Sequence, residues 1–160
     1  MDANTTELRF RPRPERVAFD LSRYPPDEEL GPAALRFLYF THRVALSVGG
    51  TEIFGPSESP FTNIGVLHAA LGLREALDGC EDLGESGFDS IGGGGVDVRF
   101  RCDGSGTVQL SGINGGVASD SIASLRGALD AFDEAVRSFL LGMFPDLLEH
   151  PRYGWWFRGE

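Results

Sequence analysis

The sequence predicts an α+β fold, in which a mainly antiparallel sheet of about five to six strands carries two helices packed on one face. Short apolar segments of alternating polarity come in pairs joined by glycine-rich turns, which is typical of β-hairpins and antiparallel pairing. Two longer segments repeat apolar residues at helical spacing, and two helices suffice to cover one face of such a sheet. The expected order is β-β-β-α-β-β-α, in a single domain spanning residues 1–160.

Residues 1–32 are expected to form an irregular N-terminal arm with one short strand. Arg11–Pro14 cannot belong to a central strand, because its two prolines donate no hydrogen bond to a ladder. Val17, Phe19 and Leu21 then alternate with their neighbours, which predicts the short strand. The polar, proline-rich residues 24–32 are expected to be a loop.

Residues 35–54 predict a long strand, a tight turn and a returning strand. Apolar side chains occupy every second position over Val44–Val48. Gly49–Gly50 follows, and glycine readily adopts the positive φ that a two-residue primed turn requires. Glu52–Phe54 is the expected returning strand.

The first predicted helix follows residues 55–60, whose glycine and prolines end that hairpin. Thr62 or Asn63 can cap it, and its apolar residues lie near one face from Ile64 to Leu77. We expect it to end at Asp78–Gly79, where glycine favours termination.

A second hairpin is predicted between the helices. Val96–Cys102 alternates apolar and polar residues, residues 103–106 form a glycine-rich turn, and Val108 and Leu110 return. Cys102 falls on the apolar side and is expected to be a small core residue. The glycines at 92–95 lead into a strand rather than a helix, which favours a flexible connector over a phosphate loop.

The second predicted helix is the clearest element of the sequence. It has a candidate cap at Ser119 or Asp120, and Pro145 ends it. Its apolar positions are spaced alternately by three and four residues, which indicates one core-facing stripe: Ile122, Leu125, Leu129, Phe132, Val136, Phe139 and Met143.

The charge of the chain excludes some partners. There are 24 acidic residues against 14 arginines and no lysine, a net charge of −10. Residues 44–95 alone hold eight acids and a single arginine, Arg74. Such a field repels phosphate backbones and anionic membranes, so neither nucleic acid nor membrane is an expected partner. It would attract a basic protein, although ordinary solubility charge is the better explanation of the total taken alone.

No motif of the sequence points to catalysis, a metal or a cofactor. His42, His68 and His150 share no ligand spacing and are expected to be ordinary surface histidines. No nucleophile motif is present, so an enzyme is not expected. Cys80 and Cys102 are too few for a disulfide-dense secreted scaffold, and no signal peptide or membrane-spanning run is visible. A cytoplasmic location is therefore expected.

Two segments are candidate partner-binding surfaces. Residues 78–89 hold five carboxylates, no base and three glycines, and are either a solvated connector or an acidic loop that docks a cationic partner. The candidate contact residues of this loop are Glu81, Asp82, Glu85 and Asp89.

The second candidate is the aromatic tail at residues 145–160. It is expected to fold back and seal an edge of the sheet or core; otherwise Tyr153, Trp155 and Trp156 form a sticky patch of residue types that are common in interface hot spots. Such a patch would make a homo-oligomer possible.

About half of the chain, residues 35–113, resembles a family of small α+β proteins, mainly actinobacterial, whose function is uncharacterised. The matching pieces are Val44–Phe54, the helix from Ile64 to Leu77, and Phe88–Ser90 before a hairpin. The chain is also similar in general type to immunity proteins of bacterial polymorphic toxin systems, which are commonly small, acidic and cytoplasmic. That likeness implies a non-catalytic protein that occludes the active site of a basic toxin with an acidic surface. The alternative is a small enzyme or ligand-binding domain with a pocket between sheet and helices.

Overall fold

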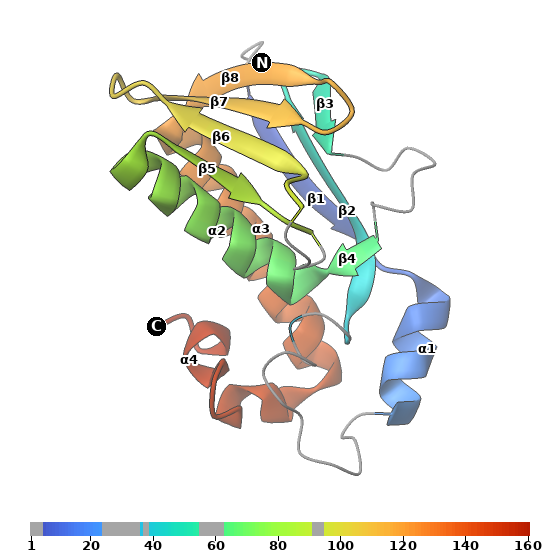
Figure 1. Cartoon of the computed structure of the whole chain (residues 1–160). Coiled ribbons are helices and arrows are strands. Elements are labelled where there is room, and N and C mark those ends of the chain that lie inside the picture. Colours follow the sequence, from blue (N-terminus) through green and yellow to red (C-terminus); the bar gives the residue numbers. More distant parts are fainter. Residues whose placement is uncertain (1–4, 24–35, 37–38, 55–62, 91–94) are drawn as a thin grey trace.

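The computed structural model describes residues 5–23, 36, 39–54, 63–90 and 95–160 (Figure 1). The α+β class and the antiparallel pairing predicted from the sequence are confirmed. The single sheet of five to six strands is wrong, because the strands divide into two four-stranded sheets. The two predicted helices are also too few, since the described residues contain four α-helices and one short 3-10 helix.

Sheet A is built from the first half of the chain. β2 lies between β1 and β3 and also pairs with β4, all antiparallel. The turn between β2 and β3 is the predicted one, with Gly49 and Gly50 at φ 55° and 82° and Val48 opposite Thr51. The strands of this sheet are β1 (Thr6–Arg11), β2 (Thr41–Val48), β3 (Thr51–Phe54) and β4 (Asn63–Gly65).

Sheet B follows the chain order, with each strand hydrogen-bonded to the next. The predicted hairpin forms its centre, whereas the first and last strands were not predicted. The last strand occupies the position at which a helix cap was expected. The strands are β5 (Glu85–Phe88), β6 (Val98–Cys102), β7 (Thr107–Gly112) and β8 (Val117–Ser121).

The N-terminal prediction is wrong in two places. Residues 6–11 are a strand, β1, rather than an irregular arm, and the expected short strand is the helix α1 (Pro14–Arg23). Proline is well suited to the first turn of a helix, because its missing N–H would have no partner there. Phe19 and Leu21 remain largely exposed, so their alternation did not mark a buried strand face. The loop predicted for residues 24–32 lies outside the described residues, as do residues 92–94 of the glycine run.

The two predicted helices are present, with shifted ends. α2 (Val66–Leu83) continues past Asp78–Gly79 and ends at Gly84, which has φ 87° and donates its N–H to the carbonyl oxygen of Cys80 at 2.8 Å. α3 (Ile122–Met143) is capped by Ser121, whose hydroxyl accepts a hydrogen bond from the Ser124 N–H at 3.0 Å. A 3-10 helix, η3 (Pro145–Glu149), and the short helix α4 (Gly154–Phe157) follow.

Both long helices pack into the core that the two sheets share. Figure 1 shows α2 and α3 side by side, with sheet B in front and sheet A behind. The predicted stripe of α3 faces this core: Leu125, Leu129, Phe132 and Val136 are buried, and Ile122, Phe139 and Met143 pack against the core partly exposed. The buried apolar residues of both sheets belong to the same cluster as those of the helices.

The two sheets meet where β3 lies against the β7–β8 hairpin. A Cβ atom on Gly112 would overlap the carbonyl oxygen of Ile53, and one on Gly116 would overlap that of Glu52. Only glycine allows the backbones to approach this closely. A second link is polar: the Asp120 carboxylate of β8 accepts hydrogen bonds from the N–H (3.1 Å) and hydroxyl (2.5 Å) of Thr6.

Alanine at the sheet junction should therefore destabilise the protein. We expect Gly112→Ala to lower the free energy of unfolding by about 1–3 kcal/mol, because the added methyl group forces the two backbones apart. The matched control is Gly127→Ala in α3, where a Cβ atom meets nothing within 4 Å and should raise stability by about 0.5–1 kcal/mol through helix propensity. Urea denaturation checks both, and equal effects of the two variants would contradict the junction.

Candidate functional site

The predicted acidic loop is not a loop. Glu81 and Asp82 lie in the last turn of α2, Glu85 begins β5, and Asp89 follows the end of that strand. The helix passes through Gly79 and is ended only by Gly84, so the segment is regular structure rather than a solvated connector. The four predicted contact residues are consequently held on two different elements.

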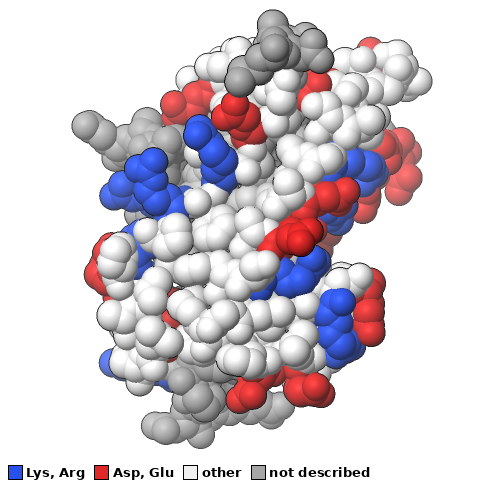
Figure 2. All heavy atoms as spheres, turned by 180° about the vertical axis from the view of Figure 1, so that it is seen from behind, with Lys and Arg blue, Asp and Glu red and all other residues white. Residues whose placement is uncertain are grey.

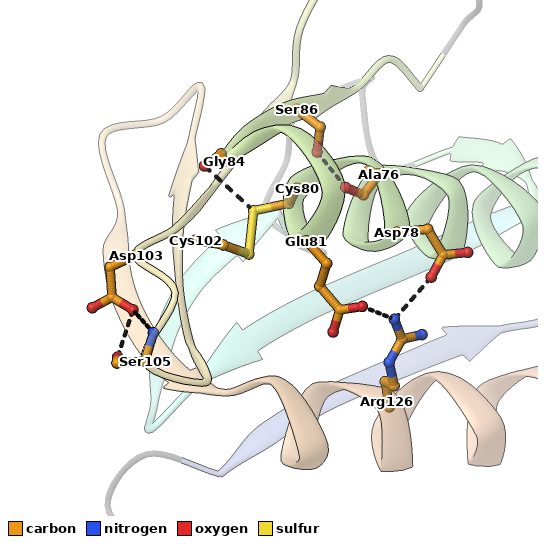
Figure 3. The surroundings of a disulfide bond; sticks show 10 residues. All are labelled: Ala76, Asp78, Cys80, Glu81, Gly84, Ser86, Cys102, Asp103, Ser105 and Arg126. Carbon is orange, nitrogen blue, oxygen red and sulfur yellow. Dashed lines mark hydrogen bonds and ion pairs between the residues drawn. A yellow bond between two sulfur atoms is a disulfide. The ribbon is translucent and has the colours of Figure 1, made fainter.

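Two arginines connect carboxylates of α2 and α3, and Figure 3 shows one of them, Arg126. Arg126 of α3 reaches across to α2, where its Nη2 lies 2.8 Å from Asp78 and 2.6 Å from Glu81. Arg74 of α2 makes the reverse connection and contacts Asp130 at 2.8 Å and Asp133 at 2.9 Å on α3. Arg74 and Arg126 therefore connect α2 and α3 in both directions.

Carboxylates still outnumber guanidinium groups along this helix pair. Residues 74–82 of α2 and 126–134 of α3 carry seven acids and two arginines, a net charge of −5. We call the charged residues of these two ranges the acidic helix face. In Figure 2 charged side chains form a diagonal band along α3. Within the described part of the chain, Asp82 and Glu134 are exposed and have no ion-pair partner.

The structure thus brings together Glu81 and Asp82 but separates them from Glu85 and Asp89. Glu85 lies on sheet B, where its carboxylate is 4.0 Å from the guanidinium of Arg101. Asp89 lines a cavity on another side of α2. The α3 carboxylates were missed, although Asp130 and Glu134 stand four residues apart, a spacing that places both on one side of a helix.

A disulfide anchors the acidic end of α2 to sheet B (Figure 3). It joins Cys80 of α2 to Cys102 of β6, with Cα atoms 5.7 Å apart. Cys102 packs against the core as predicted, but the disulfide that it forms was not predicted. Glu81 and Asp82 directly follow the bonded Cys80, so the covalent link restrains the backbone that carries both. Glu81 is held in addition by its ion pair with Arg126.

A cavity of about 280 Å³ lies between α2 and β5. Arg36, His68, Glu75, Phe88 and Asp89 line it. The His68 ring stacks on Phe88 with centroids 5.2 Å apart, and Arg36 forms a two-point ion pair with Glu75. The prediction of surface histidines is wrong for His68, which is only 6% exposed, and for His42, which is fully buried.

The hydrogen bonds of His68 indicate which nitrogen of its ring carries the proton. Its Nδ1 accepts a hydrogen bond from Arg36 Nε at 2.8 Å, so the ring proton resides on Nε2 and points to the Asp89 carbonyl oxygen at 2.5 Å. Burial lowers the pKa of His68, which keeps the ring neutral. Both ring nitrogens are engaged in hydrogen bonds, so His68 has no free lone pair with which to accept a proton or bind a metal. Its ring can still contact a ligand in the cavity.

The described residues contain no group of three or more His, Cys, Asp or Glu side chains placed to hold a metal ion. Nor does this part of the chain include a helix with both the length and the apolar character needed to cross a bilayer.

The aromatic tail folds onto the end of α3. Tyr153 is 8% exposed and Trp156 is 4% exposed, whereas Trp155 is 46% exposed. Arg137 of α3 donates from Nε to the Trp156 carbonyl oxygen at 2.7 Å and lies 4.7 Å from the indole ring centre. Of the three predicted contact residues, Trp155 alone presents a large accessible surface.

Two buried polar residues hold α1 against β2. His42 Nδ1 accepts a hydrogen bond from the Arg13 N–H at 3.0 Å. Asp20, which is fully buried, accepts one from the Phe40 N–H at 3.1 Å and lies 3.4 Å from Arg16. Both side chains work within the fold rather than at its surface.

Comparison with known proteins found no matching family model, curated protein or solved structure. The resemblance to the actinobacterial family and the likeness to immunity proteins therefore stay predictions.

Reduction of the disulfide should weaken the fold. The two cysteines are 22 residues apart, and closing a loop of that length in the unfolded chain is worth about 3 kcal/mol. We expect a reductant to lower the urea midpoint of the wild-type protein and to leave that of a Cys80→Ala/Cys102→Ala variant unchanged. A wild-type midpoint that does not respond to the reductant would contradict the link.

His42 should make stability depend on pH. Burial, aided by Arg13 and Arg16, lowers its pKa from 6.5 to about 4. The unfolded chain therefore takes up the proton first, so stability is full above about pH 6.5 and falls towards pH 4 by up to about 3 kcal/mol. Asp20 acts in the opposite sense, because burial raises its pKa.

His42→Gln keeps an acceptor for the Arg13 N–H but does not titrate. Its free energy of unfolding should fall less than that of the wild type as the pH is lowered through this range. Urea denaturation at a series of pH values measures both, and parallel curves for the two proteins would rule His42 out as the cause.

Proposed function

We propose that this chain is a non-catalytic binding protein that neutralises a basic protein toxin by covering its active site, as immunity proteins do. The observation that carries the proposal is the acidic helix face, which has seven carboxylates and two arginines on two adjacent helices. One of the seven, Glu75, pairs with Arg36, which leaves six carboxylates against Arg74 and Arg126. Such a face suits an enzyme that binds an anionic substrate, since carboxylates can occupy the positions of phosphate groups.

The rigidity of the face supports this role. Arg74 and Arg126 bridge α2 and α3, and the disulfide ties α2 to β6. Carboxylates held in place before binding lose little conformational freedom on docking, which favours affinity. Asp82 and Glu134 are exposed without an ion-pair partner among the described residues, so they are available to a cationic partner.

Long-range attraction is the second supporting argument. A net charge of −10 speeds the encounter with a basic partner, and a local surplus of carboxylates orients it. Exposed charges at the rim of an interface act mainly on the association rate and its salt dependence.

One observation favours the alternative, a ligand-binding or catalytic domain with a pocket between sheet and helices. The cavity beside His68 lies between α2 and β5, and at about 280 Å³ it is near the lower end of the size of small-molecule sites. Arg36 donates hydrogen bonds to both His68 and Glu75 in this cavity, so a ligand would compete with existing contacts.

Neutralising the two unpaired carboxylates should separate these functions. The proposal requires a basic toxin domain, to be sought in the neighbouring gene. We expect Asp82→Asn/Glu134→Gln to slow association with that domain and to flatten the salt dependence, with unfolding unchanged. The matched control, Glu52→Gln/Glu149→Gln, removes the same charge from exposed positions outside the acidic helix face. Stopped-flow binding at two salt concentrations measures both, and equal rates for the two variants would contradict docking on the acidic helix face.

A further inference from the structure

Two arginines stand directly opposite each other on the outer face of sheet A. Arg11 of β1 and Arg43 of β2 are register partners in the antiparallel pair. Opposite residues point to the same side, with Cβ atoms about 5 Å apart. Arg9, two residues before Arg11, lies on that side as well, and all three are exposed.

No carboxylate contacts Arg11 or Arg43 directly within the described residues. Like charges directly opposite on neighbouring strands destabilise a sheet, yet neither Arg11 nor Arg43 forms an ion pair within the described residues. The two acids nearest in sequence form their ion pairs with other arginines: Glu7 with Arg9 at 3.6 Å, and Glu15 with Arg13 at 3.1 Å. The charge of Arg43 also acts on Glu15, whose pKa it helps to lower, without direct contact between the two side chains.

The arginine pair is unusual for this chain. Most of the other arginines contact a carboxylate, among them Arg16, Arg36, Arg74 and Arg126. The sequence has ten more acids than bases, yet no carboxylate of the described residues lies within ion-pair distance of Arg11 or Arg43. In Figure 2 basic side chains gather at the upper left, away from the band along α3.

The surface is hollowed at the same place. Arg9, Arg11 and Arg43 line a hollow of about 140 Å³ whose floor includes the small side chain of Ala45, the partner of Arg9 across the strands. A second hollow of about 280 Å³ shares Arg9 and Ala45 and adds the carboxylates of Glu7 and Glu52.

We propose that the hollow between Arg11 and Arg43 binds the phosphate group of a small phosphate monoester. Guanidinium groups bind phosphate oxygens in pairs, and a dianion would neutralise both arginines at once. The first hollow has room for one such group. Glu7 and Glu52 repel a second anion in the neighbouring hollow, which favours a single terminal phosphate on a neutral or cationic remainder over a polyanion.

This site lies on sheet A, away from the acidic helix face, so it stands independently of the proposed toxin partner. The probes are inorganic phosphate, phosphoethanolamine and triphosphate, titrated into isotope-labelled protein and followed by the amide NMR shifts of β1 and β2. We expect saturable binding of phosphate, binding at least as tight for phosphoethanolamine, and no gain in affinity for triphosphate.

The variants Arg11→Gln and Arg43→Gln should each weaken phosphoethanolamine binding about tenfold or more, the value of one charge-assisted contact. The matched control is Arg99→Gln on β6, an exposed arginine with no ion pair in the described part of the chain. Equal weakening by all three variants, or affinity that rises with the charge of the probe, would overturn the proposal and indicate general electrostatic attraction.

Thermal unfolding supplies a second readout. Without ligand, Arg43→Gln should unfold at a higher temperature than the wild type, because the like-charge repulsion is gone. Phosphoethanolamine should raise the melting temperature of the wild type and leave that of the variant unchanged. A variant that melts lower than the wild type without ligand would show that the arginine serves the fold, and would overturn the site.

Discussion

The fold depends on the contact between β3 and the β7–β8 hairpin. The two sheets approach each other closely where β3 meets this hairpin, and Gly112 and Gly116 allow that approach because neither carries a side chain. Once the sheets are joined there, α2 and α3 pack on them and close the core. The hydrogen bonds between Asp120 and Thr6 also connect the two sheets, through β8 and β1.

Charge is distributed by layer in this molecule. Residues 74–82 of α2 and 126–134 of α3 carry a local surplus of carboxylates, whereas the outer face of sheet A carries Arg11 and Arg43, which form no ion pair within the described residues. Arginines inside the helical layer act as connectors between α2 and α3 and leave the layer strongly acidic. A net charge of −10 therefore describes neither surface, and a protein that repels polyanions overall can still bind a single phosphate at a local arginine pair.

The sequence predicted correctly those elements whose structure depends only on residues close together in the chain. The turn at Gly49–Gly50 and the stripe of α3 were predicted because each depends on residues close in sequence. α1 was missed because a short run of alternating apolar residues fits a helix as well as a strand. β8 was missed because its one buried residue is Asp120, whose partner Thr6 lies at the other end of the chain.

Long-range pairings were not predictable from one sequence. A period of two shows which strand residues face a core, but not how strands divide between sheets, so a single sheet was expected. Cys80 and Cys102 meet only because β6 returns past the end of α2. Arg11 and Arg43 are opposite only through the register of β1 and β2. Gly79 and the surrounding acids resembled a turn, yet the helix continues through them.

The central claim is that opposite charges form two separate binding surfaces on this chain. One NMR experiment tests it most directly: amide shifts of the labelled protein are mapped with a short oligo-lysine peptide and, separately, with phosphoethanolamine. The account predicts two disjoint sets of shifts, in α2 and α3 for the peptide and in β1 and β2 for the phosphate. Shifts from both probes on the same elements, or scattered over all exposed charges, would contradict it.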